Sequence, residues 1–414
     1  MQKPAIQIAI SVLAIIILSG CKSQKSTTGQ ADKQAAKFNV ESLAHSNNLF
    51  TIDLFRQIQT KSDNLIFSPY SIGTVLAMIY SGSGGKTKAE MSEVLYFPSP
   101  DRLDPAESVM KEHILAMDTM PGTDIRLANA IWAQQDFSFS PEYLDRVKQY
   151  YDAPLTLMDF IQTPNREENR KKINQWVEKN TNYRIKDLIQ PGVLDASTRM
   201  VLTNAIYFNG AWMFPFEEGA TSPSLFHVSR QENMTMDFMH QTSSFPYYED
   251  EEVQAISLPY KNGRMSLMVI LPKSIEGWKI VSQVINYERI TLVRSAMKSR
   301  EVQLVLPKFR SELLINLRQE LTAMGMGTVF SRYADLSGMT GEKNLYVDEV
   351  IHKAFIEVNE SGTEAAAATA GIIGLKSSLA GDPVRFIADH PFIFFLFDQQ
   401  TACIIFTGRF VRPS

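Results

Sequence analysis

The short patterns that could do chemistry in this sequence each lack a part that the chemistry needs. Residues 85–87, Gly-Lys-Thr, look like the end of a phosphate-binding loop, but the glycine that such a loop has five positions earlier is replaced by Tyr80. Ser83 and Lys86 have the spacing of a nucleophile and a base in penicillin-recognising enzymes. However, the Ser-Asp-Asn motif at residues 62–64 precedes them, and no Lys-Thr-Gly follows. Both nucleotide binding and this acyl-transfer chemistry are therefore disfavoured.

Metal, cofactor and thiol chemistry find no better support. Neither a Gly-x-Ser-x-Gly nor a His-Glu-x-x-His motif is present, and the six histidines show no spacing that would hold a metal ion. Cys403 lies within an apolar run, where a lone thiol usually serves as inert core filling. We expect no cofactor and no metal. The histidines are His45, His113, His227, His240, His352 and His390.

The composition is that of an ordinary globular protein and excludes several function classes. The 414 residues carry 41 Lys and Arg against 45 Asp and Glu, a formal net charge of −4, which is too balanced for a surface that binds nucleic acid. Hydrophobic residues make up 44% of the chain, so a large core is possible and disorder, collagen and coiled coil are excluded. Length alone allows two or three domains or one large domain.

The N-terminus is typical of a lipid-anchored precursor. Lys3 precedes an apolar run, residues 5–18, that is too short for a membrane span. The sequence Leu-Ser-Gly-Cys at residues 18–21 resembles the cleavage site of bacterial lipoprotein precursors. Residues 1–20 are therefore predicted to be a signal peptide, and Cys21 the site of lipid attachment.

A stalk is predicted to join this anchor to the folded body. Residues 21–37 are rich in Ser, Thr, Gln and Lys and have no apolar periodicity, which predicts a flexible tether. The body, residues 38–414, would then lie in the bacterial cell envelope. It would be anchored by lipid to the outer membrane or the cell surface, facing the periplasm or the exterior.

The elements that must position any site change from helices in the first half to strands in the second. Ser68 and Pro69 have the residue types of a helix N-cap and first turn, and Thr87 with Glu90 predicts a capping box for the next helix. Helical periodicity covers residues 50–59, 72–79 and 165–180. Short apolar runs predict strands at residues 200–208, 265–271, 302–306, 391–397 and 402–411. Segregated helices and strands predict a mixed α+β fold.

One segment in the second half is unusual in composition. Residues 352–358 are predicted to form a strand, and residues 363–374, which follow, contain five alanines, no aromatic residue and a single charge, Glu364. The odd-numbered positions of this segment are all uncharged, so it could enter a sheet without burying a charge. Such a pattern fits a loop that can become a strand, but it fits a small-residue linker or an alanine-rich helix about equally well.

The context of this segment resembles a known family. Glu360, Gly362, Thr363, Glu364 and the four alanines Ala365, Ala366, Ala367 and Ala368 are similar to the hinge of inhibitory serpins. Four further passages resemble that family in the family's order: residues 64–73, 203–212, 386–392 and 406–411. The resemblance covers residues 38–413. It implies a single α+β domain with three β-sheets, about nine helices and an exposed reactive-centre loop at about residues 360–383.

The resemblance also implies site residues. In the family the scissile bond lies sixteen residues after the hinge glutamate, which places it between Lys376 and Ser377; a register slip of one residue would place it between Leu375 and Lys376. The family's shutter cluster, which lets the main sheet open, matches Ser68, Ser71, Asn204 and His352, and Trp212 matches the tryptophan where insertion begins. Ordinary helix capping, a hydrogen-bonded core histidine and simple packing are the alternative interpretations of these residues.

The function that the resemblance implies is suicide inhibition of extracellular serine endopeptidases by insertion of the cleaved loop into the main sheet. A lysine at the scissile position would suit a trypsin-like protease. The implied partner is the target protease in a covalent complex; the protein is expected to be a monomer, to bind no nucleic acid and not to be an enzyme. The alternatives are a non-inhibitory serpin-fold binding protein and an inhibitor of chymotrypsin-like or cysteine proteases.

Overall fold

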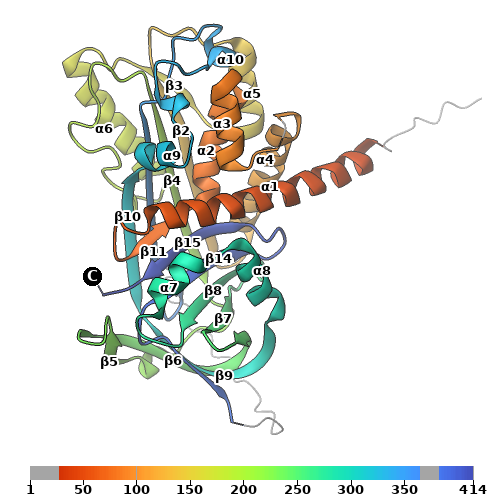
Figure 1. Cartoon of the computed structure of the whole chain (residues 1–414), viewed down its shortest axis with the longest axis vertical. Coiled ribbons are helices and arrows are strands. Elements are labelled where there is room, and N and C mark those ends of the chain that lie inside the picture. The colour runs from red at the N-terminus through yellow and green to blue at the C-terminus, as the bar shows by residue number, and fades with distance from the viewer. Residues whose placement is uncertain (1–27, 99, 364–381, 414) are drawn as a thin grey trace, which may run out of the picture.

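The computed structural model describes residues 28–98, 100–363 and 382–413. The predicted lipid site at Cys21 and the loop positions Glu364, Ala365–Ala368, Leu375, Lys376 and Ser377 lie outside the described residues. Figure 1 shows the arrangement of the described elements.

Ten α-helices form within the described residues. One of them covers part of residues 21–37, which were predicted to form a flexible stalk. The first helix, α1, begins at Thr28, inside that stalk, and its N-terminal part extends beyond the body (Figure 1). Residues 28–37 lack an apolar stripe but are rich in Ala, Gln and Lys, which have high helix propensity, so they can extend a helix whose later turns are packed. The helices are α1 (Thr28–Ile58), α2 (Pro69–Ser81), α3 (Gly85–Leu95), α4 (Pro100–Leu115), α5 (Pro141–Tyr151), α6 (Thr163–Asn180), α7 (Gly277–Val284), α8 (Tyr287–Ala296), α9 (Arg318–Ala323) and α10 (Ser337–Thr340).

The helix starts show which capping predictions hold. Ser68 caps α2 as predicted, because its hydroxyl accepts the Ser71 N–H and Pro69 is the first helical residue. The capping box predicted for α3 is wrong: its N-cap is Gly84, without a side-chain hydrogen bond. Thr87 and Glu90 bind a later part of the chain instead, because the Thr87 hydroxyl accepts the Asp335 N–H and Glu90 accepts the Thr328 N–H.

A six-stranded sheet, called the main sheet here, runs along the long axis of the molecule (Figure 1). Its central strand β4 is buried on both faces. Alternate residues of β2 and β4 face either the large core beneath α2 or a smaller cluster that includes Trp132, Ile173 and Val177 beneath α6. The order is β10 (Phe309–Asn316), β11 (Glu349–Asn359), β12 (Gly362–Thr363), β4 (Met200–Ala211), β2 (Thr123–Gln134) and β3 (Leu155–Met158).

The remaining strands form one continuous sheet of nine, where two separate smaller sheets were expected. The 17-residue strand β6 is the reason: it pairs with β5 at its start, with β9 along most of its length and with β7 at its end. The strands are β1 (Leu65–Phe67), β5 (Ser222–His227), β6 (Asn233–Glu249), β7 (Val253–Pro259), β8 (Met265–Pro272), β9 (Lys298–Pro307), β13 (Val384–Ile387), β14 (Phe392–Asp398) and β15 (Ile404–Phe410).

Candidate functional site

Strands β4 and β11 are paired directly over part of their length and separated by β12 at one end. Their parallel pairing covers residues 201–206 of β4 and 349–354 of β11. At the end that we call the hinge end, β12 is antiparallel to both strands and pairs with residues 210–211 of β4 and 358–359 of β11. Two residues of the predicted loop thus already occupy a strand position inside the main sheet.

The two residues of β12 fit this position for different reasons. Thr363 is fully buried, and its hydroxyl lies 2.5 Å from the hydroxyl of the buried Tyr260. Its inward side chain agrees with the expectation that odd-numbered positions of the segment can face the core. Gly362 lies so close to β4 that a Cβ atom would come within 2.0 Å of the Gly210 carbonyl oxygen. Only glycine can therefore start the loop at this contact.

Trp212 holds the turn that leads from β11 into β12. Its indole Nε1 donates to the Asn359 carbonyl oxygen at 3.0 Å, and its backbone N–H donates to the Ser361 carbonyl at 2.9 Å. Its ring stacks on Tyr260 with the centroids 4.5 Å apart. The Asn359 side chain accepts the N–H groups of Ser361 and Gly362. The predicted insertion tryptophan thus holds the turn through two hydrogen bonds and packs against Tyr260, which contacts Thr363.

Glu360, the hinge glutamate, is anchored on the other side of the same turn. Its carboxylate lies 3.1 Å from Lys308 Nζ and accepts the Thr221 hydroxyl at 2.8 Å. Burial disfavours its charged form, but a backbone N–H and these two partners outweigh that cost and hold the pKa of Glu360 below its ordinary value. The turn therefore begins at a fixed, negatively charged position.

The four predicted shutter residues lie together beneath the centre of the main sheet, and all are fully buried. Asn204 and His352 are partners in the β4–β11 register. The Ser68 N–H donates to His352 Nε2 at 3.1 Å, and Asn204 Nδ2 donates to the Ser71 hydroxyl at 2.7 Å. Hydrogen bonds therefore tie the first turn of α2 to both strands across the line where they meet.

The hydrogen bonds of the His352 ring define its tautomer and protonation state. Because Nε2 accepts the Ser68 N–H, the ring proton lies on Nδ1, which donates to Asn204 Oδ1. Burial lowers the pKa of His352 to about 3. The histidine is thus neutral, and its protonation would remove the acceptor that Ser68 needs.

One member of this cluster, Asn129 of β2, was not predicted from the sequence. Its Oδ1 accepts from the Ser71 hydroxyl at 3.0 Å and from Asn204 Nδ2 at 2.9 Å. The signal in the sequence was a single amide between two alanines in an otherwise apolar stretch, residues 127–133. A polar residue at such a position needs a partner, but the sequence does not say which one.

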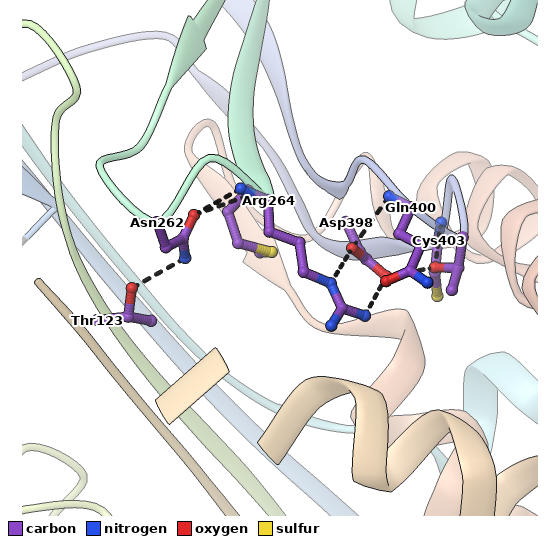
Figure 2. A network of polar contacts seen from close by, with 8 residues as sticks. Thr123, Asn262, Arg264, Asp398, Gln400 and Cys403 are labelled. Carbon is purple, nitrogen blue, oxygen red and sulfur yellow. Dashed lines mark hydrogen bonds and ion pairs between the residues drawn. The ribbon is translucent and has the colours of Figure 1, made fainter. Parts of the chain in front are cut away.

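A second polar network, which the sequence analysis also missed, supports the hinge end through the turn between β7 and β8 (Figure 2). Asn262 of this turn donates to the hydroxyl of Thr123, the first residue of β2. The Arg264 guanidinium makes two hydrogen bonds, of 2.9 and 3.2 Å, to the buried carboxylate of Asp398. Tyr260, which contacts Thr363, lies at the start of the same turn. Such bidentate pairs are geometrically specific.

Three further features of the described residues bear on other kinds of site. In residues 28–98, 100–363 and 382–413, no His, Cys, Asp and Glu side chains group in a way that could hold a metal ion. Within the same ranges, no helix has the length and apolar character needed to cross a bilayer. Cys403 is buried and unpaired, as expected for core filling, and burial raises the pKa of its thiol.

The chain is similar in sequence to proteins of one family. Residues 45–413 match the family model described as serpin (serine protease inhibitor). A serpin-like protein of Thermococcus kodakarensis is 39% identical over 89% of this chain and 85% of its own length. Leukocyte elastase inhibitor A of Mus musculus is 35% identical over 90% of this chain and 100% of its own length.

Solved structures agree with the sequence matches. Uncleaved ovalbumin has a TM-score of 0.81 at 29% identity and is matched over 90% of this chain and 100% of its own. Serpin48 of the insect Tenebrio molitor has a TM-score of 0.79 at 32% identity, over 90% of this chain and 98% of its own. With the hinge, the shutter cluster and the two sheets in place, the chain belongs to the serpin family.

Proposed function

We propose that this protein is a suicide inhibitor of extracellular serine endopeptidases, with trypsin-like enzymes as its main targets. The observation that carries the proposal is the position of Thr363, which is buried in a strand position between β4 and β11. A loop whose first residues already lie in the sheet needs only its remaining residues to be released. Cutting the loop supplies that release.

The register of β12 supports further insertion. Thr363 pairs with Gly210 of β4 and Val358 of β11. If the loop continued in this register, Thr369 would lie six residues further on, between Asn204 and His352, which are themselves paired. A continued β12 would therefore pass between strands that are already in matching register. Thr369 would face the shutter side, where its hydroxyl can both donate and accept hydrogen bonds. The other odd-numbered positions of the segment are uncharged, so insertion would bury no charge there.

The proposed reaction begins as ordinary proteolysis. The protease serine attacks the Lys376 carbonyl, the bond to Ser377 breaks, and the new amine leaves with a proton from the protease histidine, which leaves an acyl ester on Lys376. Insertion would then carry the acyl-enzyme along the sheet before water hydrolyses the ester. If Leu375 is the residue attacked, chymotrypsin-like enzymes become the targets.

Incubation with trypsin tests this proposal. We expect a complex that survives a denaturing gel, at about one protease per inhibitor, together with loss of trypsin activity. Trypsin inactivated at its serine by a covalent reagent is the matched control and should form no such complex. Clean cleavage of the loop with trypsin still active would instead favour the alternative, a non-inhibitory serpin-fold binding protein.

We also propose that lipid on Cys21 anchors the inhibitor in the bacterial cell envelope. The support is the sequence of residues 1–21. The Cys21→Ser variant should appear in the soluble fraction of cells in which the unaltered protein sediments with membranes. Equal sedimentation of both proteins would contradict the anchor.

A further inference from the structure

At the end of the main sheet opposite the hinge end, one carboxylate bridges the start of β11 and the start of β4. We call this end the far end; it consists of residues 199–201 of β4 and its approach and residues 348–349 at the start of β11. Asp348 Oδ2 accepts the backbone N–H of Arg199 at 2.6 Å and that of Met200 at 3.1 Å. The Asp348 N–H donates to the Met200 carbonyl at 3.1 Å. Three hydrogen bonds thus join the strands just before their ladder begins.

The Asp348 side chain is suited to hold this position. It is 8% exposed, so water competes little for its carboxylate. Hydrogen bonds from backbone N–H groups to a carboxylate are stronger than those between neutral groups. The Asp348 carbonyl in turn accepts from Arg318 Nη1 at 3.0 Å, which ties the residue to the start of α9. The carboxylate is therefore held from the β11 side and reaches across to β4.

The register of β12 shows how far the loop must insert before this contact breaks. If β12 continued in its present register, Ile373, ten residues after Thr363, would lie between Met200 of β4 and Asp348 at the start of β11. An inserted strand separates its neighbours by one further strand spacing, about 4.8 Å, which no hydrogen bond from Asp348 can span. Complete insertion therefore cannot leave these bonds in place.

We propose that Asp348 is a latch that keeps the far end of the main sheet closed until the cleaved loop inserts completely. This inference rests on the proposed function, because it presupposes that the loop inserts. The two ends of the sheet differ accordingly: the hinge end is already spread by β12, and the far end is tied by the latch. The intact loop can thus rest partly inserted, and the last step of insertion requires the latch to open.

The variant Asp348→Ala tests the latch through a comparison of two states of the protein. Thermolysin can nick the loop without being trapped, because a metalloprotease uses water and forms no acyl-enzyme. We expect Asp348→Ala to lower the melting temperature of the intact protein by about 5 °C and to leave that of the nicked protein unchanged, because the latch is open in the inserted state. We also expect the intact variant to lose inhibitory activity on storage at 45 °C on the order of tenfold faster than the unaltered protein, because its far end is no longer held closed by the latch.

Glu349→Ala is the matched control. Glu349 is the next residue, but its carboxylate bonds to Asn316 of β10 and does not bridge β4 and β11. Glu349→Ala should therefore change the melting temperatures of the intact and nicked forms by the same amount. Should Asp348→Ala fold poorly, Asp348→Asn, which keeps one acceptor oxygen, is expected to show a smaller shift confined to the intact form.

The outcomes separate the latch from the proposed function. Suppose that nicking raises the melting temperature of the unaltered protein but that Asp348→Ala lowers the melting temperatures of the intact and nicked forms equally. Asp348 is then only a structural residue, and the latch is wrong. If nicking does not raise the melting temperature of the unaltered protein, loop insertion itself is wrong, and the latch falls with it.

Discussion

Replacing Thr363 with Arg is expected to convert the inhibitor into a substrate. Thr363 has no exposed surface and packs against Tyr260, so an arginine there must either bury an unpaired charge or keep the hinge out of the sheet. Burial of an unpaired charge costs several kcal/mol, which exceeds what a few new ladder hydrogen bonds contribute. We therefore expect at least a tenfold loss of covalent complex with trypsin, while cleavage of the loop continues.

Two control variants isolate the cause. Thr363→Ser keeps the hydroxyl that bonds to Tyr260 and should inhibit like the unaltered protein. Glu364→Arg places the same positive charge at the next position, which the alternation of a strand assigns to the opposite face, and it should leave complex formation nearly unchanged. Complex formation by Thr363→Arg at the unaltered level would contradict insertion from the hinge end.

Acid is expected to destabilise the native sheet through His352. The pKa of His352 is about 3 in the native protein and 6.5 in an unfolded chain. Between these values the unfolded state binds more protons than the native state, so the stability falls as the pH is lowered from 6.5 towards 3. The contribution of His352 to the free energy of unfolding should be about 2 kcal/mol smaller at pH 5 than at pH 7.

The variant His352→Gln separates this contribution from that of other titrating groups. Glutamine can accept the Ser68 N–H and donate to Asn204, but it does not titrate in this range. Urea unfolding at pH 7 and pH 5 should therefore show a decrease in the free energy of unfolding that is about 2 kcal/mol larger for the unaltered protein than for the variant. Equal decreases for both proteins would mean that His352 is protonated as easily in the native state as in the unfolded one.

Local sequence signals predicted several elements well. Ser68 followed by Pro69 determines the start of α2 because the cap and the first turn involve only near neighbours in the chain. The apolar runs that became β8 and β15 were recognisable because both faces of these strands are buried. By contrast, Thr87 and Glu90 have the spacing of a capping box, yet they bind Asp335 and Thr328, more than 200 residues away.

The hinge and the shutter cluster were predicted only in part. The motif around Glu360 indicated which residues form the hinge, but Tyr260, Lys308 and Thr221, which hold it, come from distant elements. The resemblance to serpins indicated Ser68, Ser71, Asn204 and His352, whereas Asn129 could be added only when β2 was seen beside β4.

For this protein, the sequence by itself determined the family, the alternation of uncharged positions in the loop and the residues that begin α2, because these depend on side-chain type and short spacing. Only the tertiary structure decided that Thr363 already lies inside the main sheet, that His352 is held neutral and that Asp348 joins β4 to β11. The physical reason is that strand register, burial and hydrogen-bond partners are set by segments that are far apart in the chain, such as Ser68 and His352 at a separation of 284 residues, and no local pattern encodes such a pairing.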